Sequence, residues 1–486
     1  MIEFQPAIAA TFLVYLLVVL AIGVVAWRRT RDLKDYLLGG RSLGPWVTAL
    51  SAQASDMSGW LLLGLPGYAY LAGLESVWLL TGLLIGTWAN WRFTAAPLRE
   101  ATERYGDALT LPDYLERRFA DSSGLLRLVS ALFILVFFTF YTGSGLVAGG
   151  RLFEEVFGLP YLWAVGAGGL AIVVYTFFGG FLAVSWTDLV QGLLMFLALI
   201  SVCVMGLVIV GGFDGLTSGI AAANPNALNP FTDVAGEPLT VIAVLSLLGW
   251  GLGYFGQPHV LARFMAARTV AQIRRSRHIA MGWVSIALVA GLLVGIIGSL
   301  LVEPPLEGPD SEKVFMVMTG LLFHPVVAGI CLSGILAAVM STADSQLLVA
   351  SSAIAEDLYK GLLRKDAGQA EVLWVGRMGV AGIAVLAFLL AASPDSKVLD
   401  LVAYAWAGLG ATFGPVILIS LYWSGMTRSG AIAGVVAGGV TVIVWKQFSG
   451  GVFDLYEIVP GFLAATLAIF AFSRQSGTEQ REAPGQ

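Results

Sequence analysis

Long apolar stretches, each about the length of a membrane span, recur along the chain between residues 6 and 472. A spanning helix takes about 20 apolar residues, and charge-poor stretches of that length recur often enough for about 13 helices. They are rich in Leu, Gly and Ala and lack the alternation of roughly ten-residue barrel strands. The pattern therefore predicts an all-α, polytopic membrane protein and excludes an outer-membrane barrel.

Gly-rich segments interrupt two of these predicted spans, at residues 51–67 and 250–258. Each interruption follows a long connector and opens a set of about five helices, a pattern typical of an inverted repeat with its binding site at the breaks. The predicted organisation is an accessory helix with its connector (1–41), a first repeat of five helices (42–211), an external loop (212–239), a second repeat of five helices (240–424), two accessory helices (425–472) and a cytoplasmic tail (473–486).

Basic residues are concentrated in alternate connectors. The segments 28–41, 92–127, 263–277 and 360–377, with Arg428 and the tail, hold 23 of the 27 Lys and Arg residues. Because basic connectors stay in the cytoplasm, we expect an external amino terminus and a cytoplasmic carboxyl terminus. The start of the chain lacks the basic residues of a signal peptide, so the first helix is expected to remain. The expected location is a bacterial inner membrane.

Composition narrows the function classes further. The chain is 57% hydrophobic and 12% charged, with a mean hydropathy of +0.83, which indicates lipid as the main solvent. Cys203 and Cys331 lie in apolar stretches and the three histidines are far apart, so neither a disulfide framework nor a transition-metal site is indicated. We expect no cofactor and no nucleic-acid partner. A membrane enzyme and a channel are disfavoured, since no nucleophile with its base and no filter-like carbonyl repeat is found.

Asp56 is a carboxylate near the middle of the first interrupted span. Such a group costs about 2.5 to 3.5 kcal/mol on insertion scales, so its presence requires a reason. One reason is structural: the side chain caps the second half of the broken helix. The functional alternative, which we favour, places Asp56 on a cation path.

A second polar cluster, Ser341 and Thr342, lies in an otherwise apolar helix, one turn from Ala338. Sodium is a hard cation that takes oxygen ligands. The two hydroxyls, the carbonyl of Ala338 and carbonyls freed near Ala54 and Met57 offer such a set. The alternative is that the hydroxyls bond back to the preceding turn of their own helix, as is common in membrane helices.

Aromatic residues accompany both interruptions: Trp60, Tyr141, Trp250 and Tyr254, with Pro258 shortly afterwards. A zwitterionic amino acid needs N–H groups for its carboxylate, carbonyls or ring faces for its ammonium, and apolar walls. The cluster offers all three. Taken singly, such aromatic residues belong more often to the core or to an interfacial belt.

Six blocks of the sequence resemble the sodium/solute symporter family: residues 38–45, 52–60, 109–114, 179–188, 249–264 and 337–342. The likeness runs from about residue 15 to residue 472. It implies 13 helices around a ten-helix inverted-repeat (5+5) core with a broken first helix in each repeat. It also implies sodium-driven uptake of L-proline by alternating access, by a monomer in the lipid bilayer with sodium as the coupling ion.

The resemblance also assigns roles by position. The sodium site it implies is Ala54, Met57, Ala338, Ser341 and Thr342. The implied proline contacts are Ser58, Trp60, Tyr141, Trp250, Tyr254 and Pro258. The implied coupling residues are Arg41, Asp56, Asp188 and Asp344. Because the family shares its sodium site across substrates, a symporter for pantothenate, a sugar or another amino acid is the alternative, and the aromatic set favours proline.

Overall fold

The structure, a computed structural model, describes residues 6–27, 37–178, 180–393 and 396–475. Within these ranges the chain is almost entirely helical and forms no strand longer than an isolated bridge. The predicted all-α class is therefore confirmed. Residues 28–36 of the first connector and 476–486 of the predicted tail lie outside the described residues, and the last helix runs to Gln475.

The helices of the first half include a long pair, α9 and α11, separated by α10. In chain order they are α1 (Pro6–Trp27), η1 (Gly39–Arg41), α3 (Pro45–Asp56), α4 (Gly59–Leu62), α5 (Gly64–Ala72), η2 (Gly73–Ser76), α6 (Val77–Ala89), η3 (Asn90–Thr94), α7 (Ala95–Arg104), α8 (Leu111–Arg118), α9 (Leu125–Phe157), α10 (Tyr161–Phe178), α11 (Phe181–Ile209), α12 (Gly212–Ala223) and η4 (Pro225–Leu228).

The second half begins with another short, broken series. Its helices are α13 (Val241–Gly249), η5 (Trp250–Gly256), α14 (Pro258–Met265), α15 (Val270–Leu301), η6 (Gly308–Lys313), α16 (Val314–Leu322), α17 (Pro325–Ser352), η7 (Ala353–Leu363), α18 (Gln369–Ala391), α19 (Val398–Tyr422), α20 (Arg428–Trp445), η8 (Gly451–Asp454) and α21 (Ile458–Gln475).

Nine helical stretches in the described part of the chain are long and apolar enough to cross a membrane, and a tenth joins α13–η5 to α14 through a bend of 44°. Two shorter apolar segments, Tyr161–Leu170 within α10 and Ile458–Ser473 within α21, fall below that length. The chain is therefore polytopic, while the total of 13 spans and the division into repeats stay predictions.

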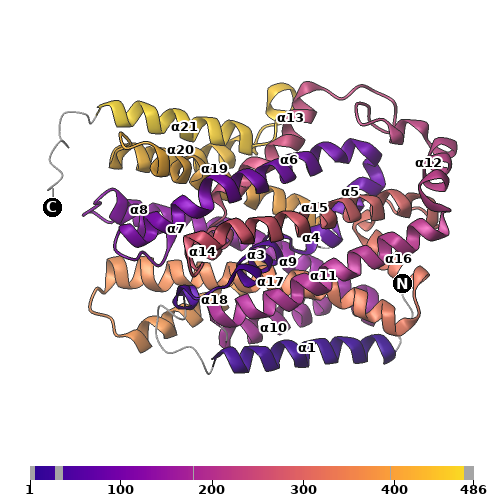
Figure 1. Ribbon diagram of the computed structural model, residues 1–486, viewed down its shortest axis with the longest axis horizontal. Coiled ribbons are helices and arrows are strands. Elements are labelled where there is room, and N and C mark those ends of the chain that lie inside the picture. The colour runs from indigo at the N-terminus through magenta and orange to yellow at the C-terminus, as the bar shows by residue number, and fades with distance from the viewer. Residues whose placement is uncertain (1–5, 28–36, 179, 394–395, 476–486) are drawn as a thin grey trace.

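The long helices run side by side along one direction of the molecule (Figure 1). The described chain begins at one end of this bundle and finishes at the other. The helices α7 and α8 of a basic connector lie at the left in that view, and α12 and α16 lie at the right. Sequence patterning did not predict α12 and α16, because short helices in connectors carry no span-length apolar signal.

Glycines bring α6 into backbone contact with η5. A Cβ added at Gly86 would lie 2.2 Å from the carbonyl oxygen of Gly251, and one at Gly251 would lie 2.2 Å from that of Gly82. No side chain fits at such separations, so only glycine permits this approach. The interruption of the second broken helix is therefore set directly against α6.

Candidate functional site

The first broken helix is interrupted between α3 and α4. Helix α3 ends at Asp56, Met57 is its C-terminal cap, and Ser58 begins the next half by accepting a hydrogen bond from the backbone N–H of Trp60 at 3.4 Å. The Ser58 N–H turns back to the Asp56 carbonyl at 3.0 Å. Carbonyls at the end of α3 thus lack the helical donors that a continuous helix would supply.

Oxygen atoms from α17 meet the end of α3 at this break. The Ser341 hydroxyl lies 2.8 Å from the Ala54 carbonyl oxygen and 3.1 Å from that of Ala338, and the Thr342 hydroxyl lies 3.3 Å from the same Ala54 oxygen. All four residues are buried. Four of the five predicted sodium ligands therefore converge, and the fifth, Met57, is buried at the cap of the same helix.

The contacts across helices go beyond ordinary back-bonding within a helix. A hydroxyl that only bonded back to its own turn would use a carbonyl three or four residues earlier, as the Ser345 hydroxyl does with the Ser341 carbonyl at 2.8 Å. Ser341 also has such a carbonyl, that of Ala338, within reach, but the hydroxyls of Ser341 and Thr342 both contact the Ala54 carbonyl, 287 and 288 residues away. Several oxygens thus gather around few protons, and oxygen atoms are the ligands that a hard cation takes.

The Asp56 carboxylate is fully buried at the end of α3, two residues after Ala54. Neither of its oxygens has a hydrogen-bond partner among the described residues. The Tyr254 hydroxyl interacts with it electrostatically from η5, without the geometry of a hydrogen bond. The N-terminal cap of α4 is Ser58. The structural explanation, in which the Asp56 side chain caps the second half of the broken helix, is therefore wrong.

Aromatic side chains also contact the break between α3 and α4. The Trp60 indole N–H and the Tyr141 hydroxyl both donate to the main-chain carbonyl of Asp56, at 3.2 and 3.4 Å. The Trp60 ring lies 6.4 Å from that of Trp250, across the gap between the two broken helices. Tyr254 packs edge-on against Trp406 at 4.9 Å.

The second broken helix is held by a residue that sequence analysis missed. The Trp406 indole N–H on α19 donates to the Trp250 carbonyl at 2.7 Å, and both residues are buried. The breaks of the two helices are lined by five of the predicted proline contacts: Ser58, Trp60, Tyr141, Trp250 and Tyr254. Pro258 starts α14 and, with Phe181, lines a small cavity of about 30 Å³.

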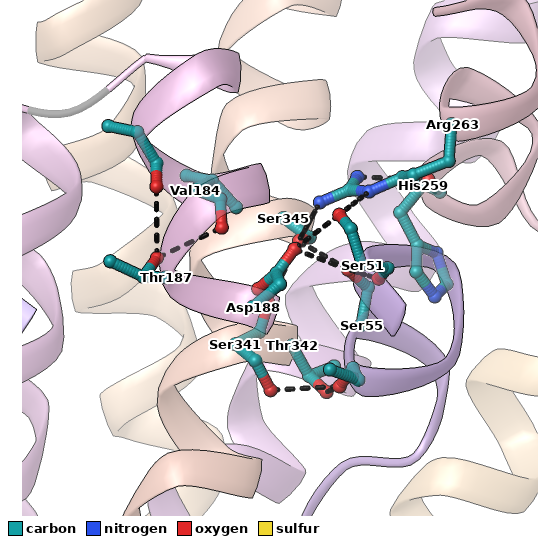
Figure 2. A network of polar contacts seen from close by, with 12 residues as sticks. Ser51, Ser55, Val184, Thr187, Asp188, His259, Arg263, Ser341, Thr342 and Ser345 are labelled. Atoms are coloured by element: carbon teal, nitrogen blue, oxygen red, sulfur yellow. Dashed lines mark hydrogen bonds and ion pairs between the residues drawn. The ribbon is translucent and has the colours of Figure 1, made fainter. Parts of the chain in front are cut away.

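A buried ion pair lies next to the oxygen cluster. Asp188 of α11 and Arg263 of α14 are 3.1 Å apart, and both side chains are fully buried. The same carboxylate oxygen of Asp188 accepts from the Ser51 and Ser55 hydroxyls at 2.6 and 3.2 Å, and Arg263 donates to Ser345 at 2.5 Å. Figure 2 shows these groups converging a short way from Ser341 and Thr342. The network joins α3, α11, α14 and α17.

The position of Arg263 corrects one part of the sequence analysis, which counted it with a cytoplasmic connector. It is buried inside α14, where it also donates to the His259 carbonyl at 2.9 Å. Its apolar surroundings, Val260, Leu261 and Phe264, were a signal for burial. A buried cation requires an anionic partner, and Asp188 supplies it by direct contact, with the charge of Asp344 acting in the same direction.

Arg41 lies apart from this network. Its guanidinium donates to Asp107 at 2.7 Å, to Thr102 at 3.2 Å and to the carbonyls of Met265 and Ala108 at 2.5 and 3.0 Å. Burial and the neighbouring Arg99 lower its pKa, and Asp107 opposes that shift. Its backbone is left-handed, with φ of 52°, and the four hydrogen bonds hold that strained conformation in place.

Asp344 and Arg41 are therefore not brought together by the structure, although both were expected to act in coupling. Asp344 is fully buried on α17 and interacts electrostatically with Arg263. Arg41 instead ties the start of α3 to the ends of α7 and α14, where the Leu43 N–H also donates to the Ala266 carbonyl at 3.3 Å.

Two broken helices around a buried oxygen cluster define an ion-coupled membrane transporter, and the comparisons agree. The chain belongs to the sodium:solute symporter family, whose model matches residues 36–438. Among its relatives, the sodium/proline symporter of Salmonella typhimurium is 54% identical over 468 residues, which cover 95% of this chain and 92% of the relative. The high-affinity proline transporter PutP of Bacillus subtilis is 48% identical, over 93% of this chain and 95% of the relative.

A solved structure supports the fold. This chain is similar to a Na+-coupled sialic acid symporter with a TM-score of 0.79 over 100% of both chains, at 18% sequence identity. At that identity the likeness concerns the fold alone. It agrees with an all-α transporter architecture.

Proposed function

We propose that this protein is a secondary active transporter that couples inward sodium movement to the uptake of L-proline by alternating access. The observation that carries the proposal is the oxygen cluster in which hydroxyls of Ser341 and Thr342 reach the Ala54 carbonyl at the break of the first broken helix. Relatives named for proline transport at 48 to 54% identity over nearly the whole chain support proline as the solute.

In this proposal sodium binds at Ala54, Met57, Ala338, Ser341 and Thr342. Proline binds between the broken helices, against Ser58, Trp60, Tyr141, Trp250 and Tyr254, with Pro258 at the base of the second helix. Bound sodium would replace the mutual hydroxyl–carbonyl hydrogen bonds with shared coordination and so fix the segment 54–58, which also carries proline contacts. That shared segment is the physical basis for coupling.

We further propose that Asp56, Asp188, Asp344 and Arg41 serve coupling rather than direct solute contact. Asp56 places a negative charge beside the cation, and the Asp188 network holds α3, α11, α14 and α17 together. Arg41 holds the segment before α3 against the end of α14 and against Asp107. No chemical bond of the solute is changed in this scheme, so the protein is proposed not to be an enzyme and to need no cofactor.

The proposed setting is a bacterial inner membrane, with the protein active as a monomer. The amino terminus would be external and the carboxyl terminus cytoplasmic, since the basic connectors with α7 and α8 lie at one end of the bundle and α12 and α16 at the other (Figure 1). The proposed core is the ten-helix inverted repeat, with residues 42–211 and 240–424 as its halves.

The deciding experiment is uptake of labelled proline into proteoliposomes with and without an inward sodium gradient. We expect accumulation that requires sodium and collapses when the gradient is dissipated. Labelled pantothenate, a sugar and other amino acids serve as competing solutes. Sodium-driven uptake of one of them, with no proline uptake, would keep the sodium site and replace the solute.

A further inference from the structure

The first helix, α1, lies outside the proposed inverted repeat, yet it contacts the helix that carries the hydroxyls of the oxygen cluster. A Cβ added at Gly329 of α17 would lie 2.2 Å from the Thr11 hydroxyl and 3.0 Å from the Cα of Ile8. The Phe12 ring packs edge-on against Phe157 of α9 at 5.7 Å. Helix α1 is therefore fastened to the bundle by close contacts on one face.

Tyr15 extends this contact to the level of the cation site. It is 7% exposed, and its hydroxyl accepts a hydrogen bond from the Gln191 side-chain amide at 2.9 Å and lies 3.8 Å from the Met340 sulfur. Met340 directly precedes Ser341. Gln191 follows Asp188 by three residues on α11, so both lie on one face of that helix.

The α11 helix is also set against α3 at this level. A Cβ added at Gly192, the residue after Gln191, would lie 3.4 Å from the Cβ of Ala54, whose carbonyl belongs to the oxygen cluster. The Trp283 indole N–H donates to the Gly192 carbonyl at 3.0 Å. Tyr15 thus bridges α11 and α17 at the depth where Ala54 and Ser341 must meet.

Burying polar side chains inside a membrane bundle costs desolvation free energy, so their presence calls for a reason beyond the packing of helices. The buried Gln191 amide nitrogen donates to the buried Tyr15 hydroxyl, while the amide oxygen of Gln191 has no partner among the described residues. Such residues typically mark functional positions. Cation ligation depends on donor positions held to within about 0.5 Å, which a neighbouring hydrogen bond can secure.

We propose that Tyr15 is a positioning residue for the cation site: its hydroxyl, held by Gln191, fixes the spacing of α11 and α17 and so lets an accessory helix set the sodium affinity. The inference rests on the proposed function, because it concerns the same oxygen cluster. Tyr15 touches neither the solute nor the cation. The alternative is that the Tyr15–Gln191 pair only holds helices together.

The test is Tyr15→Phe, which removes one oxygen and keeps the ring. We expect the sodium concentration for half-maximal proline binding to rise by roughly three- to tenfold, the range for one lost buried hydrogen bond. Proline affinity at saturating sodium should stay unchanged, because coupling acts only through sodium occupancy. Gln191→Leu should give the same shift, and the double variant should add little to either single one.

Tyr161→Phe is the matched control, because the Tyr161 hydroxyl also bridges two helices, donating to the Ala391 carbonyl at 2.9 Å. It should leave sodium dependence unchanged. An unaltered sodium half-saturation in Tyr15→Phe, or equal shifts in Tyr15→Phe and Tyr161→Phe, would overturn the inference. Should Tyr15→Phe fail to reach the membrane, Gln191→Leu carries the same test.

Thermal melting of the purified wild-type protein in a sodium series, without any solute, distinguishes a failure of the proposed function from a failure of the positioning role. Sodium must raise the melting temperature if the cation site exists. No sodium effect in the wild-type protein would refute the proposed function itself. A sodium effect of equal size and midpoint in the wild type and in Tyr15→Phe would refute only the positioning role.

Discussion

The Asp188 carboxylate and the Arg263 guanidinium lie 3.1 Å apart with neither side chain exposed, and they join α11 to the second half of the second broken helix. Removing one partner of such a pair leaves an uncompensated buried charge. The packing of α11 against α14 therefore depends on both charges, that of Asp188 and that of Arg263.

Arg263→Gln should lower the stability of the protein by about 3 to 5 kcal/mol. Adding Asp188→Asn should restore part of that loss, since the orphaned carboxylate is then neutral. Thermal melting in detergent micelles measures both variants against the wild type. Additive losses in the double variant would mean that the two charges do not depend on each other.

Thr342→Ala and Trp250→Ala should respond differently to sodium. Loss of the Thr342 hydroxyl weakens the cation site, so proline binding should fall only at sodium concentrations that no longer saturate, and high sodium should restore it. Loss of the Trp250 ring removes a wall of the solute pocket, so proline affinity should fall at every sodium level. Equilibrium binding of labelled proline across a sodium series measures both. A Thr342→Ala variant insensitive to sodium would contradict the assignment.

Asp56→Asn should impair activation by sodium far more than folding. The substitution keeps the shape of a side chain whose carboxylate makes no hydrogen bond among the described residues, and it removes only the charge. Membrane abundance serves as the folding control beside a sodium titration of uptake. Normal sodium dependence in a well-expressed variant would show that the charge has no part in coupling.

Impermeant thiol labelling of single cysteines tests the proposed orientation. Arg274→Cys and Arg364→Cys should react only from the cytoplasmic side, and Glu307→Cys and Glu237→Cys only from outside. Glu237 is preferred to Asp233, whose carboxylate accepts two backbone N–H groups. The native Cys203 and Cys331 are buried and give little background. Labelling of positions 237 and 274 from one side would show that α13–η5 and α14 do not form a span.

Asp121 predicts a pH-dependent contribution to stability outside the spans. Burial alone would raise its pKa, but hydrogen bonds from Ser123 and the Leu126 N–H, with the Arg428 charge 2.8 Å away, outweigh burial and lower the pKa. A lowered folded-state pKa means that the stabilisation is complete above the unfolded pKa and is lost as pH falls through the folded one.

Asp121→Asn should therefore cost about 1 to 2 kcal/mol at neutral pH. The difference from wild type should begin to shrink as the pH falls below about 4, where the carboxylate of the unfolded wild-type protein takes up a proton, and should be lost once the pH is below the lowered folded-state pKa. Melting temperatures of both proteins across that range measure it. A difference that is constant with pH would assign the effect to shape and not to charge.

The breaks and the oxygen cluster could be predicted because each leaves a local mark in the sequence. Ser58 and Gly59 interrupt an apolar run, and the hydroxyls of Ser341 and Thr342 stand in a helix that is otherwise apolar. The helical class follows from span-length apolar runs in the same way. These features depend on residues that are neighbours in the chain.

Features that depend on packing between distant segments could not be read from one sequence. Arg263 meets Asp188 across 75 residues, and Trp406 reaches the Trp250 carbonyl across 156. The Tyr15–Gln191 bond spans 176 residues. Each residue type was visible, but its partner is chosen by how the helices lie in three dimensions. A basic residue near a connector was for that reason counted with the connector.

The contact of α6 with η5 has a mechanical consequence. Where Gly86 and Gly251 meet, two bare backbones touch without an intervening side chain, so no rotamer change can absorb a displacement between them. A displacement of one element toward the other is therefore transmitted directly through the backbone contact. The second broken helix therefore cannot move closer to α6 at its interruption, and we expect the two elements to move together there during the proposed transport cycle.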